Sequence, residues 1–161
     1  MTHPVDAVRA RALRGLRQLA GADAPVASVL PLLRDRSARV VRAAADLLRP
    51  VAAELPDGLA RSLLADENRT AVRRAGYRLL HEPDPVARLL VHLRVAADPD
   101  PRLAVRAAAD AVTLLRRAAT TARLRPDPAT RAELLALAHE VTDRIGPDRL
   151  DLLHRATVGG E

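Results

Sequence analysis

The chain of 161 residues contains no cysteine, lysine, phenylalanine or tryptophan, and only one tyrosine, Tyr77. The absence of cysteine excludes a disulfide framework, thiol chemistry and a cysteine-based zinc site. The near absence of aromatic residues removes the stacking surfaces that single-strand binders and base-flipping enzymes use. No apolar run approaches the roughly 18 residues that span a bilayer, and the first 20 residues have no signal-peptide pattern. We therefore expect a soluble protein of the cytoplasm.

Motifs for catalysis and for metal binding are also missing from the sequence. The five histidines form no HExxH or i,i+4 pair, the three serines stand in no nucleophile elbow, and the seven glycines build no phosphate loop. His92 lies in an apolar stretch and is expected at the edge of the core. The sequence therefore predicts no enzyme, no cofactor and no metal site.

The charge is basic and uneven. All 26 basic residues are arginine, and the net charge is +6. Residues 1–80 hold 14 arginines against 8 acidic residues, whereas residues 126–161 hold 4 against 7. Such asymmetry can guide an acidic partner to one end of a chain, or it can be drift.

One dipeptide recurs four times at a nearly fixed interval. The sequence Val-Arg stands at residues 8–9, 41–42, 72–73 and 105–106, at spacings of 33, 31 and 33. Four positions after each valine comes a small residue, namely Ala12, Ala45, Gly76 and Ala109. A period in this range indicates a helical repeat array, and the small residues are expected to let successive helices approach closely.

Residues 35–48, 66–79 and 98–112 share the form acid, short turn, Val-Arg, small residue, aliphatic. This pattern resembles the HEAT repeat in its bacterial HEAT-like form. The resemblance implies an all-α, right-handed α-solenoid of helix pairs, about nine helices in all. In each pair a helix B would line the concave face and a helix A the convex face.

The expected organisation is one continuous array. Residues 1–124 are predicted to be HEAT-like repeats, the first of which lacks helix A. Residues 125–158 are predicted to be a C-terminal capping helix pair, and residues 159–161 a disordered tail. Pro50 is expected to kink or end its helix, because proline has no N–H and clashes with the preceding turn.

The motif arginines Arg9, Arg42, Arg73 and Arg106 are expected to form a column, which has two interpretations. They can bind an anion, or they can be structural, since acidic residues six or seven positions before the last three could pair across the turn. Arg42–Asp46 and Arg106–Asp110 are also opposite charges at i,i+4 on one helix face.

Arg73 differs from the other motif arginines because its i+4 neighbour is Tyr77, between Arg74 and Arg78. Tyrosine and arginine dominate interface energetics, so this group is a candidate hot spot; the alternative is a tyrosine lying along its own helix. Two further clusters have a similar ambiguity, because arginine near a helix C-terminus also complements the helix dipole. They are Arg9, Arg11, Arg14 and Arg17, and Arg116, Arg117, Arg123 and Arg125.

The HEAT resemblance implies protein binding above all. The sequence thus predicts a non-catalytic scaffold or adaptor that binds a protein with an acidic surface through its B-helix face. Candidate residues are Arg42, Arg73, Arg74, Tyr77, Arg78 and Arg106. The alternative is an electrostatic binder of duplex phosphates, and it is kept open because the basic column provides the charge for it.

Overall fold

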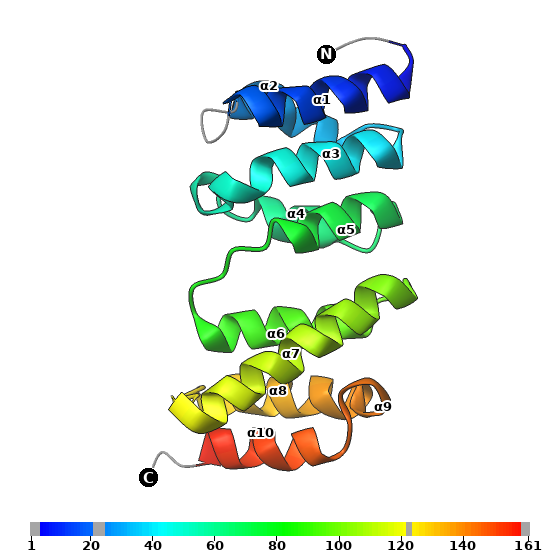
Figure 1. The fold of residues 1–161 in the computed structure, drawn as a ribbon. Coiled ribbons are helices and arrows are strands. Elements are labelled where there is room, and N and C mark those ends of the chain that lie inside the picture. The colour runs from blue at the N-terminus through cyan, green and yellow to red at the C-terminus, as the bar shows by residue number, and fades with distance from the viewer. Residues whose placement is uncertain (1–3, 21–24, 122–123, 159–161) are drawn as a thin grey trace. The chain divides into compact units, whose positions relative to one another are not determined.

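The computed structural model describes residues 4–20, 25–121 and 124–158, and within these ranges it is all-helical, without strands. This confirms the predicted fold class at its coarser level. Figure 1 shows the helices, whose bounds are α1 (Asp6–Ala20), α2 (Val26–Val29), η1 (Leu30–Arg34), α3 (Ala38–Leu48), η2 (Arg49–Glu54), α4 (Leu59–Leu64), α5 (Thr70–Arg78), α6 (Pro85–Ala96), α7 (Pro101–Thr121), α8 (Pro128–Glu140), α9 (Thr142–Ile145) and α10 (Asp148–Val158). Here η denotes a 3₁₀ helix.

Packing divides the chain into two compact units, residues 1–81 and residues 82–161. The boundary predicted after residue 124 rests on the repeat pattern, and it stays a prediction. The expected tail at residues 159–161 lies outside the described residues.

In the first unit, α3 lies between neighbouring helices. It packs against α1, α5 and η1, and α5 packs in turn against α4. In Figure 1, α1, α3 and α5 follow one another as successive layers. The unit's fully buried leucines come from α1, η1, α3 and α4 and from the residue that follows α5, and they are Leu13, Leu33, Leu47, Leu48, Leu63 and Leu79.

In the second unit, the long helix α7 packs against α6, α9 and α10. Two of its helices begin where the sequence places an Asp-Pro pair. The Asp84 and Asp127 side chains accept hydrogen bonds from the first free backbone N–H groups of α6 and α8, and Pro85 and Pro128 follow at the first helical position. The sequence signal and the local structure agree here because a cap is a strictly local interaction.

The end of α3 follows the prediction for Pro50. α3 stops at Leu48, a 3₁₀ helix continues from Arg49 to Glu54, and Val51 inside it leaves helical backbone angles. A proline in this position removes one backbone donor and crowds the preceding turn, which ends the α-helix.

The valine and the small residue of the recurring motif are buried at two of its four occurrences and exposed at the other two. Val41 and Val72 are 0% and 3% exposed, whereas Val8 and Val105 are 45% and 66% exposed. On α1 the reason is that, among the described residues, α1 packs mainly against α3 and has no neighbouring helix on its outer side.

On α7 the reason is a register difference of one residue. Asp35 and Asp98 both accept a hydrogen bond from the backbone N–H two residues later, at Ser37 and Asp100, just before the helix begins. Counted from this turn, Ala104 occupies the position of Val41, and Ala104 is indeed buried. Val105 therefore falls one position outside the buried face.

Gly76 also acts differently from the expectation for the small-residue column. A Cβ built on Gly76 would lie 2.8 Å from the Ala60 carbonyl oxygen and 2.8 Å from the Leu63 Cβ. Both atoms belong to α4, the partner within the same helix pair. The glycine therefore sets the close approach of α4 and α5, not that of α5 to another long helix.

We predict that Gly76→Ala destabilises the protein. The added methyl group must displace backbone and side-chain atoms of α4, and overpacking of this kind costs about 1–3 kcal/mol. Gly15 in α1 is the matched control, because an added Cβ meets no atom within 4 Å there. Gly15→Ala should stabilise by about 0.5–1 kcal/mol through helix propensity alone. Urea unfolding followed by circular dichroism measures both, and equal effects of the two substitutions would contradict the packing argument.

Candidate anion-binding groove

A groove of about 350 Å³ lies on the first unit, lined by residues of α1 and α3. Two arginines come from each helix, Arg14 and Arg17 from α1 and Arg39 and Arg42 from α3. Both pairs are spaced i,i+3, which places the two side chains of a pair on one helix face. The packing of α1 on α3 brings the two pairs together around one groove. We call this the arginine groove; its remaining lining residues are Ala7, Leu13, Ala43 and Asp46.

Three of the four guanidinium groups are available to a ligand. Arg14, Arg17 and Arg39 are exposed, and within the described ranges none of them has a carboxylate oxygen within 4.0 Å. Three neighbouring cations raise the local positive potential, and a carboxylate or phosphate bound among them would relieve it. The fork of donors on a guanidinium suits both anions, because it can form two parallel hydrogen bonds to one of them.

Asp46 limits this charge on one side of the groove. Its Oδ1 lies 3.0 Å from the Arg78 Nη1, and its Oδ2 lies 3.8 Å from the Arg42 Nε. The predicted Arg42–Asp46 pair is therefore confirmed, as is Arg106–Asp110 at 3.0 Å. The candidate residues Arg42 and Arg78 thus meet around one carboxylate at the rim of the arginine groove, where each is partly neutralised.

The other candidate residues do not line the groove. Arg73 is only 7% exposed, and its Nη1 donates a hydrogen bond to the Asn68 carbonyl oxygen at 2.6 Å. Arg74 and Tyr77 on the same helix are half-buried. Arg106 lies on α7 in the second unit, where Asp110 accepts a hydrogen bond from its Nε. The buried guanidinium of Arg73 therefore binds the backbone of the turn that precedes α5.

Arg9 connects α1 to the turn that precedes α3. Its Nε and Nη2 donate to Asp35 Oδ2 at 3.1 Å and Oδ1 at 2.9 Å, and its Nη1 donates to the Pro4 carbonyl oxygen. The two side chains of this ion pair are 14% and 11% exposed. The expected pairing of Asp35 with Arg42 of its own repeat is therefore wrong. The turn before α3 lies against α1, so Asp35 meets the arginine of the preceding helix.

The pKa of Asp35 reflects this pairing. Burial raises the pKa of the carboxyl group, but the hydrogen bonds from Arg9 and from the backbone N–H of Ser37 lower it, and the net pKa lies below the ordinary 3.8. The charged form of Asp35 is therefore favoured in the folded protein.

Arg39 is the groove residue that the sequence reasoning missed. It stands three residues before the motif residue Arg42, and this i,i+3 spacing was the available signal. Arg14 and Arg17 belong to the cluster noted on the first helix. In the second cluster, Arg116 and Arg125 are exposed, and Arg123 lies outside the described residues.

No group of three or more His, Asp or Glu side chains that could hold a metal ion occurs in the described parts of the chain. His92 is buried as predicted, and this burial lowers its pKa below the ordinary 6.5. None of the described helices is long and apolar enough to cross a membrane. We found no family model, no curated protein and no solved structure that matches this chain.

We predict that Asp35→Asn lowers the free energy of unfolding by about 1.5–3 kcal/mol at pH 7, the range for hydrogen bonds to charged groups. Because the folded-state pKa of Asp35 is lowered, its contribution is present above the unfolded pKa of about 3.9 and is lost as the pH falls further. The difference between wild type and variant should therefore shrink at pH 3. Urea unfolding at both pH values tests this.

The control for this experiment is Asp57→Asn, which removes an exposed carboxylate of the same unit. It should change stability by no more than about 0.5 kcal/mol at either pH. A wild-type advantage over Asp35→Asn that persists unchanged at pH 3 would contradict the role of the charged pair.

Proposed function

We propose that this chain is a non-catalytic protein-interaction module that binds an acidic segment of another protein through the arginine groove. The observation that carries the proposal is the presence of three exposed arginines, Arg14, Arg17 and Arg39, around one concave surface, none of which has a carboxylate oxygen within 4.0 Å in the described part of the chain. An acidic peptide segment would neutralise these charges and would form charge-assisted hydrogen bonds with them.

The groove lining favours a protein partner over a nucleic acid. It includes the exposed Ala7 between the cations, and an aliphatic side chain flanked by carboxylates would pack on it. The single tyrosine of the chain leaves little aromatic surface on which bases could stack.

The helix pairs support a HEAT-like architecture as part of this proposal. In the first unit η1 packs with α3 and α4 with α5, so that a short helix alternates with a longer one. We propose that these are HEAT-like repeats, that the finer arrangement is the right-handed solenoid expected from the sequence, and that α1 and α3 are successive B helices. The arginine groove would then lie on the B-helix face, the surface for which the sequence predicts binding.

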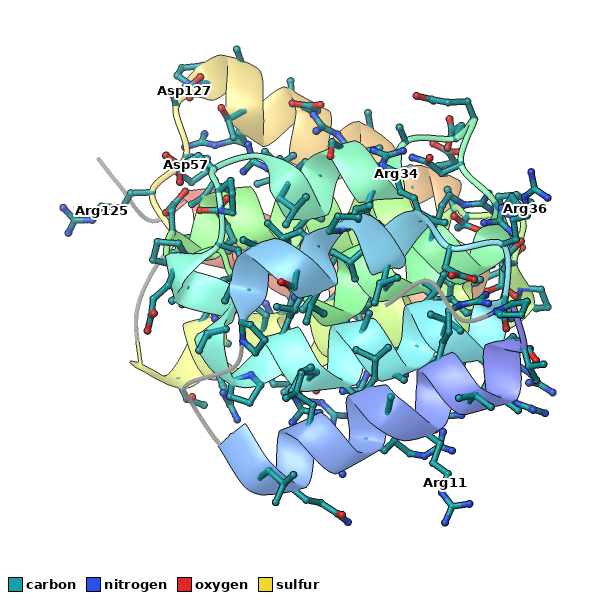
Figure 2. All side chains as sticks on the ribbon, turned by 90° about the horizontal axis from the view of Figure 1, so that it is seen from above. Arg11, Arg34, Arg36, Asp57, Arg125 and Asp127 are labelled. Carbon is teal, nitrogen blue, oxygen red and sulfur yellow. The ribbon has the colours of Figure 1, made fainter. Side chains whose placement is uncertain are left out.

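The decisive experiment compares two triple variants with the same loss of charge. The probe is a fluorescent, proline-containing peptide rich in glutamate with one leucine, titrated by anisotropy. Replacing Arg14, Arg17 and Arg39 by glutamine should weaken binding by about 10- to 100-fold, because each arginine loses a charge-assisted contact. The control replaces the exposed Arg36, Arg102 and Arg125 by glutamine; Figure 2 shows the Arg36 and Arg125 side chains extended away from the helices. The control should bind almost as tightly as wild type.

Equal weakening in both triple variants would contradict the groove, since it would indicate a response to net charge alone. The nucleic-acid alternative has its own signature. Duplex DNA that binds more tightly than the peptide, with a steep salt dependence and with loss in the groove variant, would replace the proposed partner by phosphates.

Asp46→Asn supplies a test in the opposite direction. Removal of the carboxylate frees Arg42 and Arg78 and lowers the repulsion of an acidic ligand, so affinity for the same peptide should rise about two- to fivefold at low salt. Asp57→Asn removes an equal charge from the same unit at an exposed position away from the groove lining. Its effect should be smaller. A decrease in affinity on Asp46→Asn would contradict the assigned role of the carboxylate.

A further inference from the structure

The outer side of α1 carries an apolar stripe. Val5, Val8 and Leu19 are 50%, 45% and 89% exposed, and Ala12 between them is also exposed. The spacings of three, four and seven residues place these side chains on one face of a helix. Val5 belongs to this helical turn because its carbonyl oxygen accepts hydrogen bonds from the N–H groups of Val8 and Arg9. We call this surface the α1 stripe.

The same sequence positions on α3 show what such a face does when a neighbour is present. Val41 and Ala45 correspond to Val8 and Ala12 in the repeat, and both are 0% exposed. α3 has α1 and α5 as neighbours, whereas α1 has α3 on one side. The α1 stripe is thus a helix-packing surface on which, in the described part of the chain, no helix is packed. Contiguous exposed apolar residues of this kind mark interaction sites.

The charges beside the stripe indicate the chemistry of the helix that would cover it. Arg11 lies on the face of α1 next to the stripe, and its side chain extends into solvent in Figure 2. The only acidic residue of α1 is Asp6, which is occupied on the inner side, where its Oδ2 accepts a hydrogen bond from the Ser37 hydroxyl at 2.8 Å. Within α1 itself, the charge beside the stripe is therefore positive, and no free carboxylate of this helix competes with it.

This charge disfavours a second copy of the chain as the occupant. Two α1 helices packed antiparallel about a two-fold axis near Ala12 would bring their Arg11 side chains close to each other, and like charges at an interface are destabilising. An amphipathic helix with acidic residues beside its apolar face has the opposite charge at the same place.

We propose that the α1 stripe binds an amphipathic helix of a partner protein, with its apolar residues on Val5, Val8 and Leu19 and its acidic residues facing Arg11. The helix would occupy the position that α1 itself occupies on α3. This mode is the laying of an apolar helix face on a hydrophobic surface. The inference deepens the proposed function, on which it rests for an acidic partner, and it assigns that partner a second, helical contact.

The test uses two designed peptides of identical composition. In the first, leucines at i, i+3, i+4 and i+7 form one face of a glutamate-rich helix; in the second, the same residues are scrambled so that no apolar face forms. The first peptide should bind wild-type protein at least about tenfold more tightly. Val8→Asn combined with Leu19→Asn should abolish this advantage. Val105→Asn, at an exposed valine of α7, is the matched control and should leave it intact.

The substituted side chains are exposed, so each variant is expected to fold, and circular dichroism checks this. Equal binding of the two peptides, or an advantage that survives Val8→Asn and Leu19→Asn, would overturn the proposal. Concentration-dependent dimerisation that these substitutions abolish would also overturn it, because it would assign the α1 stripe to a second copy.

The two proposals fail separately. The proline-containing peptide cannot form a continuous helix, so its binding reports on the arginine groove and should be unaffected by Val8→Asn and Leu19→Asn. If the wild-type protein binds the helical peptide but not the proline-containing peptide, only the proposed function is contradicted. If it binds the proline-containing peptide but shows no preference for the helical peptide over the scrambled one, only the proposal for the α1 stripe is contradicted.

Discussion

The burial of α3 on nearly all sides is the constraint on which the first unit depends. Seven of its eleven residues are buried valine, alanine or leucine side chains. The alanines let neighbouring helices approach closely, while the valines and leucines fill the space between them. Only a narrow polar strip of this helix remains accessible, and it contains Arg39, Arg42 and Asp46. The core of the unit therefore determines where charge can be displayed, and the arginine groove forms along that strip.

The parts of the fold that depend on local interactions were predictable from the sequence. The all-helical class, the helix starts at Asp84-Pro85 and Asp127-Pro128, the break at Pro50 and the two i,i+4 pairs all involve residues a few positions apart. Contacts between residues far apart in the sequence were harder to predict. The pairing of Asp35 with Arg9 depends on which helix lies against the turn before α3, and no spacing within one repeat contains this information. The register of α7 likewise depends on the turn from Asp98 to Asp100, and not on the recurring dipeptide.

The candidate site was predictable to a similar degree. The arginine surplus of the first half and the position of Arg42 on a shared helix face were visible in the sequence. The exposure of each motif arginine was not. Arg9 and Arg73 bind carboxylate or carbonyl oxygens at the turns, whereas Arg14, Arg17 and Arg39, outside the recurring dipeptide, remain accessible. The recurring dipeptide therefore did not predict which arginines would be accessible, and the residues proposed to bind a ligand lie largely outside it.

The arginine groove and the α1 stripe lie on opposite sides of one helix, and the two proposals assign them different physical tasks. The groove offers long-range attraction, which accelerates association and weakens with salt. The stripe offers burial of apolar surface, which acts at contact and is nearly independent of salt. A partner that engages both gains more than the sum of two separate ligands, because the first contact raises the effective concentration of the second. An acidic segment joined to an amphipathic helix would be drawn in by the arginines and retained by the valines, and neither surface alone would need high affinity.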